Sequence, residues 1–108
     1  MNIVETTEQN VRATTDLPEL AAGFAALAHP ARLRILCHLA CREACCCREI
    51  VEAFDLAQST VSQHLKVLVD AGLVRYVPEN RRSRYMVDRE ALARLQDRAS
   101  TFLSSCCA

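Results

Sequence analysis

Residues 58–68 read Gln58-Ser59-Thr60-Val61-Ser62-Gln63-His64-Leu65-Lys66-Val67-Leu68 and have the spacing of an amphipathic helix. Val61, Leu65 and Leu68 share one side, at intervals of four and three residues. The rest of the stretch carries the candidate DNA-binding groups, which are Gln58, Ser59, Thr60, Ser62, Gln63, His64 and Lys66. Such groups hydrogen-bond base edges and phosphates, and the major groove admits a helix. An ordinary surface helix has the same pattern, so the flanking sequence must decide.

A shorter helix is predicted just before this stretch. Ile50, Ala53 and Phe54 have helical spacing, so the helix begins in or just after the run Cys45-Cys46-Cys47. Two helices joined by about four residues, the second rich in donors, form a helix-turn-helix. Gly72 then supplies the residue type expected after the end of the second helix.

After Leu73 the apolar spacing changes from helical to alternating. Residues 74–77 and 85–87 flank a turn at 78–83, a pattern that predicts two short strands in a hairpin. A hairpin beside the DNA-reading helix forms a wing that can reach phosphates or the minor groove. The wing residues expected to do so are Arg81, Arg82 and Arg84. A solvated hairpin is the alternative, but the clustering of arginines here favours the wing.

Apolar residues at helical spacing predict three more helices: one from Asp16 to near His29, a second from Pro30 to about Ala40, and a last one after Asp88. The predicted fold is therefore mainly α with a small β-hairpin, a winged helix-turn-helix of about five helices and a two-stranded wing. We expect the first and last helices to pair in a homodimer. The expected organisation is a flexible arm at 1–15, the DNA-binding and dimerisation domain at 16–104, and a cysteine-bearing tail at 105–108.

The net charge of zero hides a local basic region. Residues 58–85 hold five basic and two acidic side chains, a balance of +3, which the remaining 8 basic and 11 acidic side chains offset. A local basic patch matters more for DNA binding than the total charge. The sequence shows neither a signal-peptide pattern nor an apolar run long enough to span a membrane, so we expect a cytoplasmic protein. Without a glycine-rich phosphate loop or paired carboxylates, the sequence does not indicate an enzyme.

Seven cysteines in 108 residues call for an explanation. Thiols stay reduced in the cytosol, so metal binding or thiol chemistry explains them better than disulfides. C-x-x-C spacing is missing, which argues against structural zinc. Cys37 is expected to pack in the core, and Cys41 is open to either role. The candidate metal ligands are Cys45, Cys46, Cys47, Cys106 and Cys107.

Three motifs taken together resemble the ArsR/SmtB family of winged-helix repressors. They are Leu27-Ala28-His29-Pro30-Ala31-Arg32-Leu33-Arg34-Ile35-Leu36, the stretch at 58–68, and Ala71-Gly72-Leu73-Val74, spaced without gaps. The resemblance covers about residues 17–103. It implies a dimeric repressor that binds operator DNA when empty and leaves it when an inducer binds. It also places Ser59, Thr60, Ser62, Gln63 and His64 on the DNA-facing part of the recognition helix.

The resemblance also bears on the inducer. Zinc, cobalt and nickel sensors of the family use histidine on the last helix, where this chain has none. Arsenic, antimony, cadmium and lead sensors use a two-cysteine box at the start of the third helix. The first cysteine of that box falls on Cys46 and the second on Arg48, so the resemblance implies thiol-based sensing without a ligand set that transfers directly. The terminal Cys106-Cys107 pair resembles a vicinal cysteine pair that some arsenic-responsive members of the family have beyond the last helix.

A trivalent arsenic or antimony centre takes three sulfurs in a pyramid. Consecutive cysteines on a regular helix point about 100° apart, so a further thiol is expected from Cys41 or from Cys106-Cys107. The sequence thus predicts a repressor released when As(III) or Sb(III) binds cysteine thiolates. The alternatives are a cadmium- or lead-responsive repressor, a redox or reactive-sulfur sensor, and a thiol-rich metal-binding protein or small thiol oxidoreductase that ignores DNA.

Overall fold

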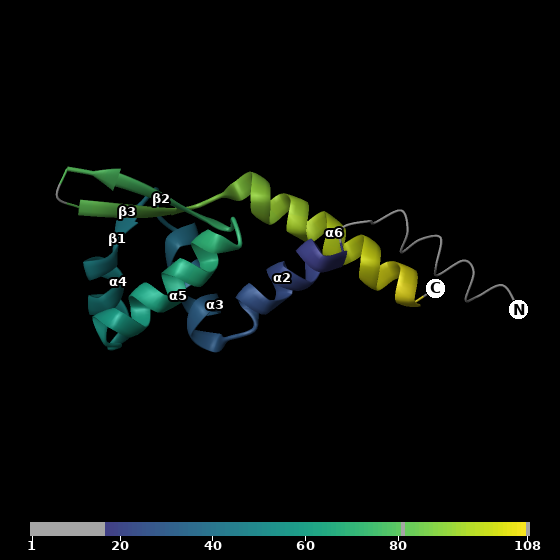
Figure 1. Ribbon diagram of the computed structural model, residues 1–108, viewed down its shortest axis with the longest axis horizontal. Helices are drawn as coiled ribbons and strands as arrows, with labels where there is room; N and C mark the ends of the chain where they lie inside the picture. The colour runs from purple at the N-terminus through teal and green to yellow at the C-terminus, as the bar shows by residue number, and fades with distance from the viewer. Residues whose placement is uncertain (1–16, 81, 108) are drawn as a thin grey trace, which may run out of the picture.

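The structure is a computed structural model that describes residues 17–80 and 82–107. The described residues form five helices, α2 (Leu17–Leu27), α3 (Pro30–Ala40), α4 (Cys47–Phe54), α5 (Gln58–Asp70) and α6 (Arg89–Cys107). They also form three strands, β1 (Cys45–Cys46), β2 (Val74–Glu79) and β3 (Arg82–Val87) (Figure 1). This arrangement confirms the predicted mainly-α fold with a hairpin wing. The arm expected at 1–15 lies outside the described residues.

The sheet has one strand more than the sequence predicts. β1 pairs with β3 in antiparallel register, with Cys45 opposite Tyr85 and Cys46 opposite Arg84, and gives the strand order β1-β3-β2. Two residues are too few to show a period of two, which explains why the sequence does not reveal this strand. The consequence is that the cysteine run is tied to the base of the wing.

The ends of α3 and α5 follow from local chemistry. His29 caps α3, because its Nδ1 atom accepts a hydrogen bond of 3.1 Å from the backbone N–H of Ala31. At the end of α5, Gly72 has a φ of +80°, a conformation that glycine adopts without strain. The N–H of Leu73 then donates to the carbonyl of Leu68 at 3.0 Å, which closes a Schellman motif between two buried leucines. This motif fixes the direction in which the chain leaves α5 for the wing.

The core lies among α3, α4, α5 and the sheet. Its fully buried side chains come from all of these elements, and they are Ile35, Leu39, Cys45, Ile50, Val61, Leu65, Leu68 and Val74. The side of α5 predicted to be apolar is the buried side, so the donor-bearing side faces outward. No single helix in the described residues is long and apolar enough to cross a membrane, although the bent pair α2 and α3 together reaches that composition.

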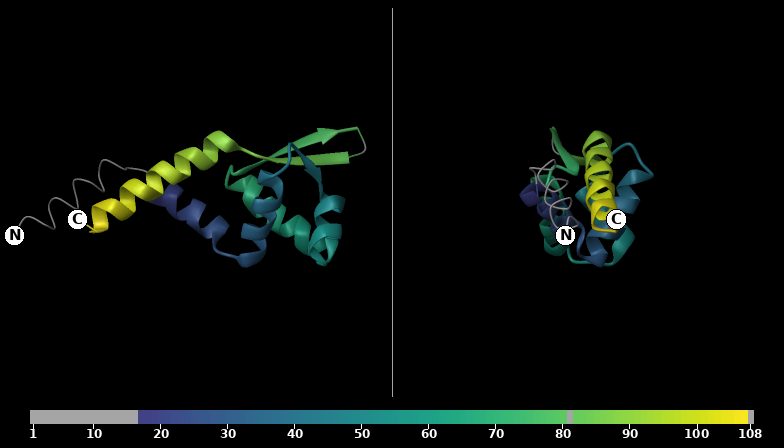
Figure 2. Two further views of the ribbon diagram at one scale, coloured as in Figure 1. Left: turned by 180° about the vertical axis from the view of Figure 1, so that it is seen from behind. Right: turned by 90° about the vertical axis from the view of Figure 1, so that its right-hand side faces the viewer.

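α2 and α6 lie side by side and extend away from the wing (Figure 2). A Cβ atom on Gly23 of α2 would lie 2.8 Å from the Cδ1 atom of Leu95 on α6, so the two helices approach closely there. α6 continues through Cys107, so residues 105–107 of the tail expected at 105–108 are helical. Backbone hydrogen bonds carry a helix past its last apolar residue, so the loss of the apolar stripe did not mark its end.

Candidate functional site

The N-terminal half of α5 presents its polar side chains to solvent. Gln58, Ser59, Ser62, Gln63 and Lys66 are exposed, and Thr60 is half-buried. Ala57 caps the helix without a side-chain hydrogen bond, so the first N–H groups of α5 stay available to an anion. The sequence analysis did not predict this contribution of the backbone. The alanine at position 57 indicates it, because an alanine side chain cannot cap the first N–H groups of the helix. Together the side chains and the helix end can bind phosphates and base edges.

His64 differs from its neighbours on α5. Its ring is half-buried against the ring of His29, with 4.5 Å between the ring centroids. Burial lowers the pKa of His64 from its ordinary value of 6.5, and the nearby charges of His29 and Arg32 lower it further. The ring thus packs α5 against the junction of α2 and α3. Its contact with DNA stays a prediction.

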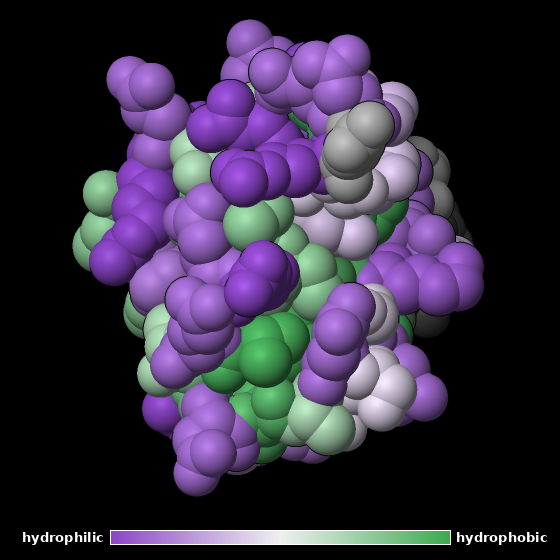
Figure 3. Space-filling view, turned by 90° about the vertical axis from the view of Figure 1, so that its left-hand side faces the viewer, coloured by the Kyte–Doolittle hydropathy of each residue, from purple (hydrophilic) through white to green (hydrophobic). Residues whose placement is uncertain are grey.

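The wing carries its cations at the exposed end of the hairpin. Arg82 is exposed, and an Nη1 atom of Arg84 lies 3.5 Å from an Oε2 atom of Glu79 on the neighbouring strand. Arg81 lies outside the described residues. The hydroxyl groups of Tyr76 and Ser83 hydrogen-bond at 2.8 Å and join β2 to β3 beside these arginines. Figure 3 shows this end of the molecule, where hydrophilic side chains surround a hydrophobic patch.

Cys45 does not belong to an accessible thiol site. Its side chain is 0% exposed within the core, and burial, followed by the charge of Glu49, raises the pKa of the thiol. Strand β1 turns alternate side chains to opposite faces and so buries Cys45, whose role as a ligand stays a prediction. Its neighbour Cys46 takes the outward position.

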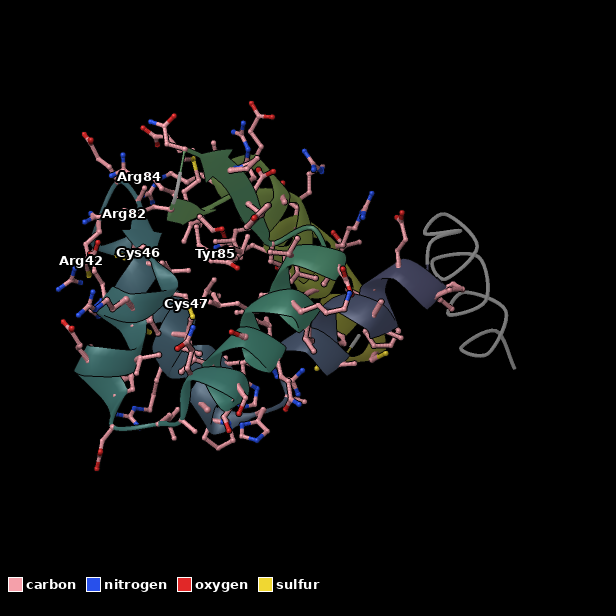
Figure 4. The ribbon with its side chains drawn as sticks, turned by 60° about the vertical axis from the view of Figure 1, so that its left-hand side comes forward. Arg42, Cys46, Cys47, Arg82, Arg84 and Tyr85 are labelled. Carbon is pink, nitrogen blue, oxygen red and sulfur yellow. The ribbon has the colours of Figure 1, made fainter. Side chains whose placement is uncertain are left out.

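Cys46 and Cys47 are half-buried and face two different elements (Figure 4). The thiol of Cys46 donates to an Oε1 atom of Glu49 at 3.4 Å, and this hydrogen bond is the main reason that the pKa of Glu49 lies below its ordinary value. The Sγ atom of Cys47 lies 3.5 Å from the Oγ atom of Ser62 on α5. Burial raises the pKa of Tyr85, with the neighbouring Cys47 as the second cause. One thiol thus faces the wing and the other touches the recognition helix.

The terminal candidate thiols are far from this pair. Cys106 and Cys107 are exposed at the end of α6, and the ribbon places that end opposite the wing (Figure 1). Cys41 is exposed, and so is Cys37, which corrects its expected packing role. Within residues 17–80 and 82–107, no three His, Cys, Asp or Glu side chains gather into a group that could hold a metal ion. The structure therefore does not bring the five predicted ligands together.

The chain resembles known regulators in both sequence and structure. Residues 29–76 match the family model described as bacterial regulatory protein, arsR family. An arsenical resistance operon repressor from Staphylococcus xylosus is 38% identical over 74 residues, which cover 68% of this chain and 70% of that protein. An ArsR-like transcriptional regulator from Rhodococcus sp. RHA1 superposes with a TM-score of 0.73 at 25% identity, over 81% of each chain. A homodimeric winged helix-turn-helix DNA-binding domain from Mycobacterium bovis superposes with a TM-score of 0.70 at 30% identity, over 86% of this chain and 85% of that one. The chain belongs to the arsR family of bacterial regulatory proteins.

Proposed function

We propose that this protein is a homodimeric transcriptional repressor whose affinity for operator DNA is controlled by the thiols of Cys46 and Cys47. The observation that carries the proposal is the position of this pair. Cys46 is paired through β1 with the wing strand β3, and Cys47 touches Ser62 on α5. A ligand on the two thiols therefore acts on both of the elements that bind DNA.

The DNA-binding step uses the exposed side of α5 and the wing. The polar side chains of α5 enter the major groove, and Arg82 with its neighbours binds the flanking phosphates. Lys66 is held by Asp70 at 3.1 Å in an exposed pair, which contributes little stability and leaves the lysine free to move to a phosphate. Charge on the wing thus positions the recognition helix over the bases.

The dimer uses the paired helices α2 and α6. Phe24 of α2 is 38% exposed and Leu103 of α6 is 54% exposed, both large apolar side chains on the helices that extend away from the DNA-binding end. A second copy that covers them buries apolar surface and sets two recognition helices about one DNA turn apart. The homodimeric Mycobacterium bovis domain supports a homodimer for this chain.

The inducer is a trivalent metalloid, arsenite or antimonite. Soft thiolates suit such a centre, and Cys46 with Cys47 supplies two of the three sulfurs that it takes. The third sulfur comes from Cys41 or from the terminal pair Cys106 and Cys107. It reaches the site by a conformational change within the subunit, or it belongs to the second subunit of the dimer. When the metalloid draws Cys47 toward its other sulfurs, it moves α4 relative to α5, and several phosphate contacts are lost together. The similarity to an arsenical resistance operon repressor supports this inducer class.

A reporter gene controlled by the DNA upstream of the protein's own gene tests the proposal in cells. Expression should be repressed and then restored by arsenite or antimonite. In the double variant Cys46→Ser/Cys47→Ser repression should persist when either is added. The matched variant Cys106→Ser/Cys107→Ser, which changes the other adjacent pair, tests whether the terminal thiols supply the third sulfur. If the reporter is never repressed, the proposed function is wrong.

One observation favours a second candidate, an oxidant-sensing repressor. The described residues gather two accessible thiols at the wing, not three, and two suffice for oxidation to a disulfide or polysulfide link. Release of the wild-type protein from DNA by peroxide or persulfide, together with no response to metalloids, would select this function.

A further inference from the structure

A cleft between the wing and α4 contains the Cys46 thiol. It consists of two adjoining hollows of about 440 and 630 Å³, which share Cys46, Glu49 and Arg82. We call these two hollows the wing cleft. Their volumes fall within the range of about 300–1,000 Å³ that is typical of small-molecule sites. Figure 4 shows Cys46 at the edge of the sheet, close to Arg82 and Arg84 of the wing.

The charges that line the wing cleft form two ion pairs, which leave Arg82 and Glu49 outside them. Arg84 lies 3.5 Å from Glu79, and Arg48 lies 3.5 Å from Glu52. Arg82 lines both hollows, and within the described residues it has no ion-pair partner. The cleft therefore combines one half-exposed thiol with one guanidinium that is open to an added carboxylate.

We propose that the wing cleft is a thiolation site, at which Cys46 forms a mixed disulfide with a small thiol that carries carboxylates. The reactant is the symmetrical disulfide of that small thiol. The Cys46 thiolate, formed by loss of its proton to water, attacks one sulfur of this disulfide. A new S–S bond forms as the old one breaks, and the second half leaves as a thiolate. The disulfide is reduced and Cys46 is oxidised, while Arg82 binds a carboxylate of the half that remains.

The other thiols are less well placed for this reaction. Cys45 is fully buried, and Cys47 lines only the larger hollow, with its Sγ atom 3.5 Å from the Oγ atom of Ser62. Cys41 lies in a separate hollow with Arg42 and Arg89, whose guanidinium groups donate to backbone carbonyls. Cys106 and Cys107 are exposed, but serines precede them and no cation lies within four residues of the pair in the sequence. Of the accessible thiols in the described residues, Cys46 is the one that lines both hollows together with Arg82.

Thiolation would also regulate DNA binding, a consequence that rests on the proposed function. The added group occupies Arg82 and brings negative charge to the wing, where the duplex phosphates must approach. Loss of one phosphate contact and the added repulsion should lower the affinity for DNA by about tenfold or more at low salt. This effect needs no metalloid and only one thiol, although Cys46 also belongs to the proposed inducer site.

The test uses the full-length chain with Cys106 and Cys107 changed to Ser and follows adduct formation by mass spectrometry and peptide mapping. The probes are oxidised glutathione, which carries carboxylates, and cystamine, which carries only ammonium groups. Each rate is divided by the rate for the same chain unfolded in urea. The folded chain should favour oxidised glutathione over cystamine by about tenfold at low salt, with the adduct on Cys46.

The variant Arg82→Gln should abolish this preference, whereas the matched control Arg75→Gln, on an arginine outside the cleft, should keep it. Equal normalised rates for the two probes, or an adduct mainly on Cys47, would overturn the proposal. Because the reaction is followed without DNA, the thiolation site and the repressor function can fail separately. An adduct that forms with the Arg82 preference, on a chain that never binds DNA, would confirm the site and refute only the repressor function.

Discussion

The Sγ atom of Cys47, at the start of α4, lies 3.5 Å from the Oγ atom of Ser62 on the recognition helix α5. These residues are 15 positions apart and belong to the two helices of the helix-turn-helix. A change at the thiol therefore reaches the DNA-binding side of α5 through a single contact.

Replacing Cys47 by Ala should separate DNA binding from induction. A net hydrogen bond contributes about 1 kcal/mol, so the affinity for operator DNA should change by about fivefold at most. The response to arsenite should weaken by about tenfold or more, because one of two adjacent sulfurs is gone. Titrations of DNA release against arsenite measure both effects. Cys37→Ser, on an exposed thiol of α3, is the control that should leave the response unchanged.

Cys45→Ser should destabilise the fold. The side chain is 0% exposed among apolar neighbours, and an unpaired hydroxyl in such surroundings costs about 1–3 kcal/mol. The exposed substitution Cys106→Ser should change stability by about 0.5 kcal/mol or less. Urea unfolding at equal protein concentration compares them. Equal stability of both variants would contradict the core position of Cys45.

The sequence predicted the helices because their apolar side chains recur at a clear period, as in Val61, Leu65 and Leu68 of α5, all fully buried. The cysteine run was harder. Three identical residues give no indication of which side chain faces the core. The short strand β1 determines that Cys45 points inward while Cys46 points to the wing. The contact of Cys47 with Ser62 depends on how α4 crosses α5, which no local pattern encodes. The ring contact of His29 with His64 was missed for the same reason.

Leu103→Glu should weaken the dimer. The side chain is 54% exposed on α6, and a carboxylate on this apolar surface must be desolvated when a second copy covers it. A dissociation constant raised by about tenfold or more is expected in sedimentation equilibrium. Thr101→Glu adds the same charge on the other side of α6 and should have a small effect. Equal dimer dissociation constants for the two variants would mean that Leu103 does not lie in the interface.

Stability should fall as the pH drops from 7.5 to 5.5. Burial, His29 and Arg32 lower the pKa of His64 below 6.5, so in this window the unfolded chain binds more protons than the folded one. His38 has a lowered pKa as well, with burial as the first cause, and adds to the same trend. Urea unfolding across the window should show a shallower pH dependence in His64→Gln. A slope as steep as that of the wild-type protein would exclude His64 as a contributor.

Arg82→Gln should weaken DNA binding without changing sequence preference. Each phosphate contact releases condensed counterions, so losing one should lower the slope of log affinity against log salt by about 1 unit. Binding to operator and to unrelated DNA, measured over a range of salt concentrations, gives both slopes. A loss confined to operator DNA would mean that Arg82 reads bases.

The central claim is that the Cys46–Cys47 pair controls DNA binding by α5 and the wing. Fluorescence anisotropy on the DNA upstream of the protein's own gene, under reducing conditions with and without arsenite or antimonite, tests it most directly. The wild-type protein should bind tightly and be released, while Cys46→Ser/Cys47→Ser should bind as tightly and stay bound. Release of the double variant at the same metalloid concentration as the wild-type protein would contradict the claim.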